Sequence, residues 1–393
     1  MNKPSINKIY FSSYKKFSGS EMMEIRPVTI LVGKNSSGKS SISKLFPMLE
    51  NSLSNDIATP FLFDNKGVKL GVSFSDISHN GYTSGLSFGV EYSDGFAMHV
   101  DLLSPKGNED IIINKCTVSC NKQKYTLEYQ QEKDEYVDFN SGKKYSGKGF
   151  FGFVNGAFLR DIGINNVTDY AINVDYIGPF RCFPERTYYS KGYNWSNKVG
   201  IRGENAYDWL CMSQALQESV SKWYAENFDN VKLEIVSPEK GAYHINMVKN
   251  DHSVNIVDEG QGMSQVLPII VRCNLGLAGS IVVMEQPELH LHPAAHASLS
   301  QLFARSSKQA RQNYIIETHS ENILLGITEM VVNQNEDFTK DDVVIYFVDE
   351  DEEGAYLQKI TIDDEGILSD WPEGVFNESY ELMKKIREHR SKN

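Results

Sequence analysis

A phosphate-binding loop motif near the amino terminus constrains the fold of this chain more than any other feature. Residues Gly33–Ser40 read Gly-Lys-Asn-Ser-Ser-Gly-Lys-Ser, which is the spacing of glycines, lysine and serine that the motif requires. The β-branched run Val28–Val32 comes directly before it and predicts a buried strand. Apolar residues at helical spacing follow it: Ile42, Leu45, Phe46 and Leu49. A strand, a loop and a helix in this order are the context in which such a loop cradles phosphates.

The residues of this loop have separate tasks. Gly33 and Gly38 permit the tight backbone path, Lys39 reaches the β- and γ-phosphates, and the Ser40 hydroxyl is a ligand for Mg²⁺. We therefore predict that ATP with Mg²⁺ is bound by Gly33, Lys34, Asn35, Ser36, Ser37, Gly38, Lys39, Ser40 and Ser41.

A second constellation closes a hydrophobic strand with acidic residues. The run Ile281–Met284 is followed by Glu285, Gln286, Pro287 and Glu288. A P-loop ATPase places its Mg²⁺-binding acid and its water-activating group at the end of such a strand. Paired with the phosphate loop, this segment predicts a Walker B motif in which Glu285 is a metal ligand.

A third candidate is a histidine just past the end of a strand. The apolar run Tyr314–Ile316 leads through Glu317 and Thr318 to His319. A single histidine in a sequence is usually structural or solvent-exposed. Because this one follows the acidic strand, we predict that it contacts the γ-phosphate or the attacking water.

The segment Asp258–Gln265 places two glycines and a serine at a predicted helix start. Backbone N–H groups near Gly260 and Gly262, with the Ser264 hydroxyl, would suit an anion. The alternative is a plain capped helix. Its position ahead of the acidic strand favours a signature segment that contacts nucleotide.

The order of predicted elements indicates an α/β protein with an added β-rich region. Short aromatic and β-branched runs separated by turn residues fill residues 51–175, which predicts antiparallel strands there. Helix and strand signals alternate beyond Gly260. We predict four segments: the first part of an ATPase head (1–50), a β-rich lobe (51–175), the second part of the head (176–335) and a small α/β extension (336–393).

Charge and hydropathy exclude some partners. The net charge of −13 repels a nucleic-acid backbone over most of the surface, so DNA binding would need a local basic patch. No stretch approaches the roughly 18 uninterrupted apolar residues of a membrane-spanning helix. We therefore expect a cytoplasmic protein that does not bind a membrane.

The motifs, taken in order, resemble the SMC/RecF-like branch of ABC ATPases. They are similar to the ATPase domain of the overcoming-lysogenization-defect (OLD) family and to AAA-type predicted ATPases, several of which occur in bacterial anti-phage defence loci. Local likeness comes from Tyr176–Arg181, Glu285–Pro293, Gly366–Ile367 and Trp371–Gly374. The resemblance covers most of the chain but is thin over residues 82–169.

The resemblance implies an ABC-type head, a mixed sheet with flanking helices, that dimerises around two nucleotides. Each site would join the P-loop of one copy to the signature segment of the other. Gln286 departs from the family, because it occupies the usual catalytic glutamate position and an amide cannot accept a proton. Either Glu288 serves as the base, if the loop turns it inward, or the protein hydrolyses ATP slowly and works as an ATP-held switch. The predicted catalytic residues are Glu288, Gln286 and His319. The chain ends at Asn393, so we expect no toprim nuclease domain of the OLD kind.

Two smaller features keep two interpretations each. Arg181, Arg186 and Arg202 lie among aromatic and glycine residues, which suits a phosphate or nucleic-acid loop but favours structural or intersubunit packing. Lys15 and Lys16, flanked by Tyr14 and Phe17, belong either to an adenine-stacking segment or to a solvated hairpin.

The sequence as a whole predicts an ATPase whose nucleotide-dependent oligomerisation controls a separate effector protein in anti-phage defence. One alternative is a RecF-like DNA-associated repair ATPase, which the negative charge disfavours. Another is a scaffold that holds ATP without hydrolysing it and binds a partner enzyme, which Gln286 suggests.

Overall fold

The computed structural model describes residues 3–82, 84–105, 110–189, 196–334 and 337–371. Over these residues the chain forms a mixed α/β fold with additional antiparallel sheets, which confirms the predicted fold class. Residues 372–374 of the family-like tail and the rest of the predicted extension up to 393 lie outside the described residues. No helix in the described ranges is both long and apolar enough to cross a membrane.

A mostly parallel sheet is the centre of the fold. In the part of the chain that the structure describes, it has six strands, and all but the last run parallel. In spatial order they are β12 (Val174–Ile177), β17 (Ile281–Glu285), β18 (Asn313–Glu317), β3 (Val28–Gly33), β19 (Val343–Glu350) and β20 (Ala355–Ile360).

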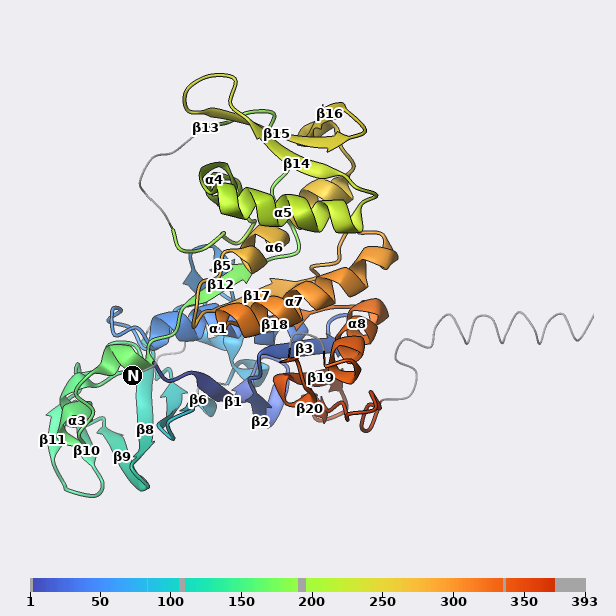
Figure 1. Cartoon of the computed structure of the whole chain (residues 1–393). Coiled ribbons are helices and arrows are strands. Elements are labelled where there is room, and N and C mark those ends of the chain that lie inside the picture. Colours follow the sequence, from blue (N-terminus) through green and yellow to red (C-terminus); the bar gives the residue numbers. More distant parts are fainter. Residues whose placement is uncertain (1–2, 83, 106–109, 190–195, 335–336, 372–393) are drawn as a thin grey trace, which may run out of the picture.

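An antiparallel sheet covers one side of the fold and extends to the lower left of Figure 1. Its eight described strands are, in order, β11 (Lys144–Ser146), β10 (Glu135–Asp138), β9 (Gln123–Gln130), β8 (Ile112–Cys120), β7 (Ala97–Leu103), β6 (Leu86–Tyr92), β1 (Ile6–Tyr14) and β2 (Phe17–Glu24). This is the predicted β-rich region. The first two strands of the chain also join it, because β1 pairs with β6.

Two smaller sheets complete the strands. At the top of Figure 1, the described residues form a four-stranded sheet of β13 (Tyr188–Tyr189), β15 (Ala242–Lys249), β14 (Lys232–Val236) and β16 (His252–Asn255). A short pair joins β4 (Asp64–Asn65) to β5 (Val68–Lys69). The predicted four-segment division of the chain stays a prediction: strands from residues 1–50 and 51–175 share one sheet, and β12 lies in the parallel sheet.

The described helices occupy the faces and edges of these sheets. They are α1 (Lys39–Ser52), α2 (Phe74–Ile77), α3 (Gly156–Asp161), α4 (Ala206–Met212), α5 (Gln214–Asn227), α6 (Gln261–Asn274), α7 (His296–Ala310) and α8 (Glu321–Val332).

Alternation along the central strands divides the interior into two cores. Leu31, Val283 and Ile315 face the core that contains α1 and the antiparallel sheet. Their neighbours along the strands face the other core, which contains α6, α7 and α8. Because successive side chains of a strand point to opposite faces, a sheet buried on both sides needs the continuous apolar runs that these strands have. Helix α1 is thereby held between the two sheets, with the phosphate loop at its start.

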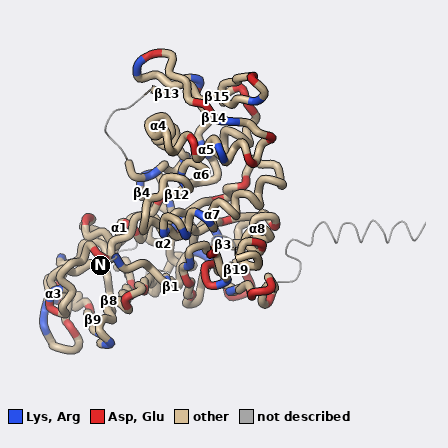
Figure 2. Tube along the Cα trace, viewed as in Figure 1, with Lys and Arg blue, Asp and Glu red and all other residues tan. Residues whose placement is uncertain are grey.

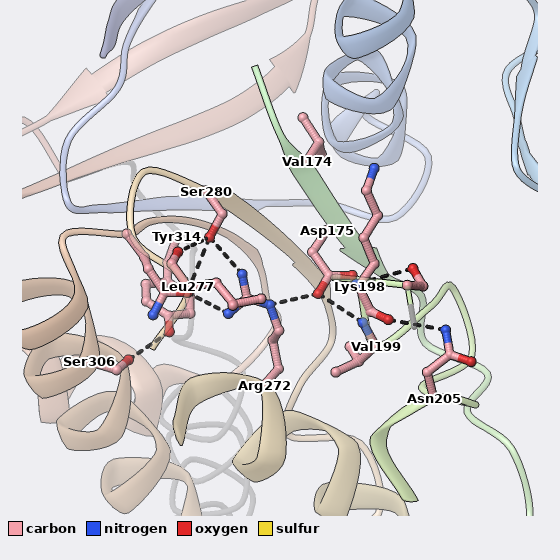
Figure 3. A network of polar contacts seen from close by, with 12 residues as sticks. Val174, Asp175, Lys198, Val199, Asn205, Arg272, Leu277, Ser280, Ser306 and Tyr314 are labelled. Carbon is pink, nitrogen blue, oxygen red and sulfur yellow. Dashed lines mark hydrogen bonds and ion pairs between the residues drawn. The ribbon is translucent and has the colours of Figure 1, made fainter. Parts of the chain in front are cut away.

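A buried ion pair ties α6 to the sheet (Figure 3). Arg272 of α6 is fully buried, and its Nε donates to Asp175 Oδ2 of β12 at 2.6 Å. The remaining guanidinium nitrogens donate to Ser280 Oγ at 2.7 Å and to Gln312 Oε1. Burial raises the pKa of Asp175, opposed by the Arg272 charge. Removing one member of such a pair leaves an uncompensated charge in the interior.

We expect Arg272→Met to lower the free energy of unfolding by about 3–5 kcal/mol, because it strands the buried Asp175 carboxylate. A second change, Asp175→Asn, should recover part of the loss by removing the charge while keeping an oxygen for the Val199 amide, which donates to Asp175 Oδ2 at 3.0 Å. Chemical denaturation measures both. The control is Lys8→Met at the half-exposed pair with Glu91, expected to cost under about 1 kcal/mol. A cost for Arg272→Met no larger than the control would contradict this account.

Candidate functional site

The three motif segments meet at one edge of the parallel sheet. Strands β3, β18 and β17 lie side by side, and Leu31, Glu317 and Glu285 are neighbours in register at their carboxyl ends. The loops that follow therefore leave the sheet at the same edge, which is where open α/β sheets bind ligands.

The phosphate loop depends on glycine at its first position. Gly33 has φ +145°, and a Cβ at this residue would lie 2.2 Å from the carbonyl oxygen of Val348 on the neighbouring strand β19. At the other end of the loop, Gly38 is the N-cap of α1 with φ +113°. Both conformations are ones that side-chain-bearing residues rarely adopt, so the motif glycines are required by the backbone itself.

Lys39 points back into the loop. It is 4% exposed, and its Nζ donates to the carbonyl oxygens of Gly33 at 2.9 Å and Lys34 at 2.5 Å. Burial lowers the pKa of Lys39, opposed by the charge of Glu317. Within the described residues, Ser37 Oγ is buried without a hydrogen-bond partner. An unsatisfied hydroxyl and a buried ammonium at a helix start fit a phosphate group.

A cavity of about 510 Å³ lies in front of this loop. This volume suits a nucleotide. The wall of the cavity includes loop residues together with residues from the ends of β17 and β18. The lining residues are Lys15, Lys16, Asn35, Ser36, Gly38, Lys39, Ser40, Ser41, Asp76, Ser78, Gln286, Glu317 and His319. The structure thus brings the predicted phosphate loop, Gln286 and His319 to one cavity.

Glu317 is a cavity residue that sequence reasoning missed. Its Oε1 accepts from Ser40 Oγ at 2.9 Å and its Oε2 from Ser43 Oγ at 3.2 Å. Burial raises the pKa of Glu317, and the hydrogen bond from Ser40 opposes the shift. The signal was present in the sequence, because Glu317 ends an apolar strand as Glu285 does. The carboxylate nearest to the predicted Mg²⁺-binding hydroxyl is therefore that of Glu317.

Glu285 lies behind this position and is held by a tyrosine. It is 6% exposed, and its Oε1 accepts from Tyr176 Oη on β12 at 2.5 Å. Burial, together with the charge of Glu317, raises the pKa of Glu285 to about 7, and the Tyr176 hydrogen bond opposes this rise. Two carboxylates side by side in register, one of them near half-protonation at neutral pH, favour a cation between them and the loop.

Gln286 and His319 face the cavity from neighbouring strand ends. Gln286 has φ +46°, and its backbone N–H donates to the backbone carbonyl oxygen of Glu317 at 2.7 Å. Burial lowers the pKa of His319, and the positive charge of Lys39 lowers it further. A neutral imidazole is thus favoured near pH 7, which can accept or donate a hydrogen bond.

Glu288, the predicted base, is buried next to the cavity but is not among its lining residues. Its Oε1 accepts from Thr318 Oγ1 at 2.7 Å and from the His319 amide at 3.0 Å. In this arrangement the carboxylate holds the backbone of His319 in place. The role of Glu288 as a base stays a prediction that its position does not support.

The predicted signature residues lie outside the cavity lining of their own chain. Gly260 is the exposed N-cap of α6, and Ser264 is buried with its Oγ bonded to the Gln261 carbonyl oxygen at 3.3 Å. A Cβ at Gly262 would lie 2.7 Å from the carbonyl oxygen of His290, so the helix start packs on the turn after β17.

The hairpin between β1 and β2 contributes charge, not aromatic stacking. Tyr14 and Phe17 are fully buried in the core, which excludes them from stacking on a base in this cavity. Lys15 and Lys16 line it instead. Lys16 Nζ contacts Glu350 Oε2 at 2.5 Å on the β19–β20 turn.

Two family models match parts of the chain. Residues 207–324 match a family described as an AAA ATPase domain, and residues 339–386 match one described as a protein of unknown function (DUF3696). The first match includes α6, β17 and β18. This part of the chain is therefore similar to an AAA ATPase domain. No curated protein matches the chain in sequence.

Three solved structures are similar to this chain. An SMC head bound to the C-winged helix domain of ScpA has a TM-score of 0.46 and 12% identity, covering 91% of this chain and 98% of that one. The SMC head domain from Thermotoga maritima has a TM-score of 0.45 and 12% identity, and the match covers 90% of this chain and 98% of that one. The third structure is an Smc head domain with an extended coiled coil, bound to the C-terminal domain of ScpA and derived from Pyrococcus furiosus. It has a TM-score of 0.46 and 11% identity, and the match covers 98% of this chain and 100% of that one.

We expect Gly33→Ala to lower the free energy of unfolding by roughly 3 kcal/mol, because the new Cβ meets the Val348 carbonyl and the φ angle disfavours alanine. The control is Gly19→Ala in strand β2, where nothing lies within 4 Å of the new atom. That change should be neutral or slightly stabilising. Equal midpoints of thermal unfolding for the two variants would show that the close approach of β3 and β19 does not constrain this residue.

Proposed function

We propose that the protein binds ATP with Mg²⁺ and hydrolyses it slowly, and that the bound nucleotide controls how copies of the chain associate with each other and with a separate effector. The observation that carries this proposal is the cavity in which the phosphate loop, Gln286, Glu317 and His319 meet.

Each wall of the cavity has a task in this proposal. The loop amides, the start of α1 and Lys39 bind the phosphates, since Lys39 already lies inside the loop. Ser40 and Glu317 are the first candidates to hold Mg²⁺, with Glu285 as the neighbouring carboxylate. Bound Mg²⁺ would neutralise charge on the β- and γ-phosphates. With the metal bound, the Glu317 carboxylate would contact Mg²⁺ in place of its present hydrogen bond from Ser40.

The slow rate follows from the groups beside the γ-phosphate position. Gln286 can orient a water but cannot remove its proton. Neutral His319 can hold the same water or the phosphate. The carboxylates that line the cavity are those of Asp76 and Glu317, and Glu317 is already bonded to Ser40 and Ser43. A site built this way positions water better than it activates it.

Association of copies is supported by the place of the signature segment. Gly260, Gly262 and Ser264 lie off the cavity of their own chain, and Gly260 is exposed at the start of α6. In the proposal a second copy presents this helix start to the γ-phosphate, where its N–H groups and dipole favour negative charge. ATP is then held between two copies.

A defence role is the widest part of the proposal. It is supported by the sequence resemblance of Tyr176–Arg181 and Glu285–Pro293 to ATPases of anti-phage loci. The effector would be a separate protein, with the β-rich lobe of β6–β11 as the first place to seek its binding surface. Figure 2 shows basic residues interspersed with acidic ones over the described elements, which weighs against a DNA clamp.

A second candidate function is a scaffold that holds ATP without releasing phosphate. Gln286 at the cavity wall favours it, because the group at this position sets whether a water is deprotonated. The two functions share the nucleotide site and differ in turnover.

Phosphate release with ATP and Mg²⁺ separates these functions. We expect slow release by the wild type, none by Lys39→Met, and an increase of about 10²-fold in Gln286→Glu, because the new carboxylate supplies a general base. Glu288→Gln tests whether Glu288 is the base, and it should change the rate of phosphate release less than Lys39→Met does. Bound ATP with no release in the wild type would select the scaffold. Release that persists in Lys39→Met would contradict both functions.

A further inference from the structure

Strand β12 and the loop after it contact the end of β17 and the turn that follows at two points. Tyr176 Oη donates to Glu285 Oε1 at 2.5 Å. Five residues later along the chain, Arg181 Nη2 donates to the carbonyl oxygens of Glu285 at 3.1 Å and Gln286 at 2.7 Å. Arg181 is only 3% exposed, so this guanidinium belongs to the interior of the protein and not to its surface.

These contacts act on a backbone turn of unusual shape. Gln286 adopts φ +46°, a left-handed conformation that residues other than glycine rarely adopt. The turn presents two successive carbonyl oxygens to one Arg181 nitrogen. Since Gln286 lines the cavity, whatever fixes this turn also fixes how Gln286 is presented to the cavity.

A second charged group, Glu288, also acts on Arg181. The charge of Glu288 raises the pKa of Arg181 against the larger effect of burial, which lowers it to about 10. Glu288 in turn accepts the His319 amide at 3.0 Å. Within the described residues, Arg181 Nε, Arg181 Nη1 and Glu288 Oε2 are buried with no hydrogen-bond partner.

A buried guanidinium with unsatisfied N–H groups is costly, and an apolar side chain would fill the same space at less cost. We propose that Tyr176 and Arg181 are positioning residues for the metal and the attacking water: Tyr176 orients Glu285, and Arg181 fixes the backbone turn at Gln286. This inference rests on the proposed function, because these orientations matter only if ATP and Mg²⁺ occupy the cavity.

We call Tyr176 and Arg181 together the clamp. If the clamp positions the metal site, its removal should weaken metal binding and leave phosphate binding nearly unchanged. Neither residue lines the cavity or contacts Lys39. ATP binding in EDTA should therefore stay within about threefold of the wild type in Arg181→Met and Tyr176→Phe. The Mg²⁺ concentration for half-maximal ATP retention should rise about tenfold or more in Arg181→Met and less in Tyr176→Phe. Arg181→Lys should recover part of the loss, since one ammonium can still reach a carbonyl.

The experiment uses the full chain, with ATP retention measured by equilibrium dialysis in EDTA and across a Mg²⁺ titration. Tyr145→Phe removes a matched tyrosine–carboxylate bond, from Tyr145 Oη to Asp161 Oδ2 at 2.7 Å in the β-rich lobe. Arg160→Met removes an exposed arginine. Both controls should behave as the wild type does. Thermal unfolding identifies a misfolded variant, and Arg181→Lys with Tyr176→Phe carry the test if Arg181→Met does not fold.

Three outcomes would overturn the inference. A Mg²⁺ requirement within threefold of the wild type in Arg181→Met and Tyr176→Phe would show that the clamp does not position the metal site. An equal loss of binding with and without Mg²⁺ would show a merely structural role. A wild type that binds no ATP in either condition would overturn the proposed function itself. A failure of the clamp alone would differ from this, because the wild type would still bind ATP.

Discussion

Parallel pairing of β17, β18 and β3 is the constraint on which the rest of this structure depends. It places Glu285, Glu317 and Leu31 in one row at the carboxyl edge, from which the phosphate loop and the other two motif segments leave. The neighbours β12 and β19 extend the same edge, so that Arg181 and Val348 also reach the loops. Residues 277 positions apart thereby meet, as Ser40 and Glu317 do. A register slip in one strand would turn its side chains to the other face and remove its contribution to the cavity.

Buried charge organises the site in a second layer behind this edge. Arg272 holds α6, which begins with the predicted signature segment, against β12. Arg181, from the loop after β12, holds the turn that follows β17. Both guanidiniums are enclosed, and each contacts main chain or side chains of the central sheet. Such groups add little net stability but allow few alternative arrangements, because a misplaced buried charge is expensive. The two arginines thus connect the elements that surround the proposed nucleotide site to the central sheet.

The sequence predicted the parts of the site that depend on local pattern. The phosphate loop, Gln286 and His319 were assigned from strand ends and glycine spacing, and the structure brings them to one cavity. What depends on distant pairing was not predicted. Glu317 is beside Ser40 only because β18 lies next to β3, and Glu288 turns toward Thr318 and not toward the loop. The contact of Arg181 with β17 likewise needed the order of strands, which no local pattern supplies.

The central claim is that one nucleotide with its metal lies at this edge, between the loop and the ends of β17 and β18. A crystal structure with a non-hydrolysable ATP analogue and Mn²⁺, located by its anomalous signal, tests it most directly. The account predicts the metal beside Ser40 Oγ and Glu317, the γ-phosphate facing Gln286 and His319, and the Gly260–Ser264 segment of a second copy on its far side. A nucleotide bound elsewhere, or a metal remote from Ser40 and Glu317, would contradict it.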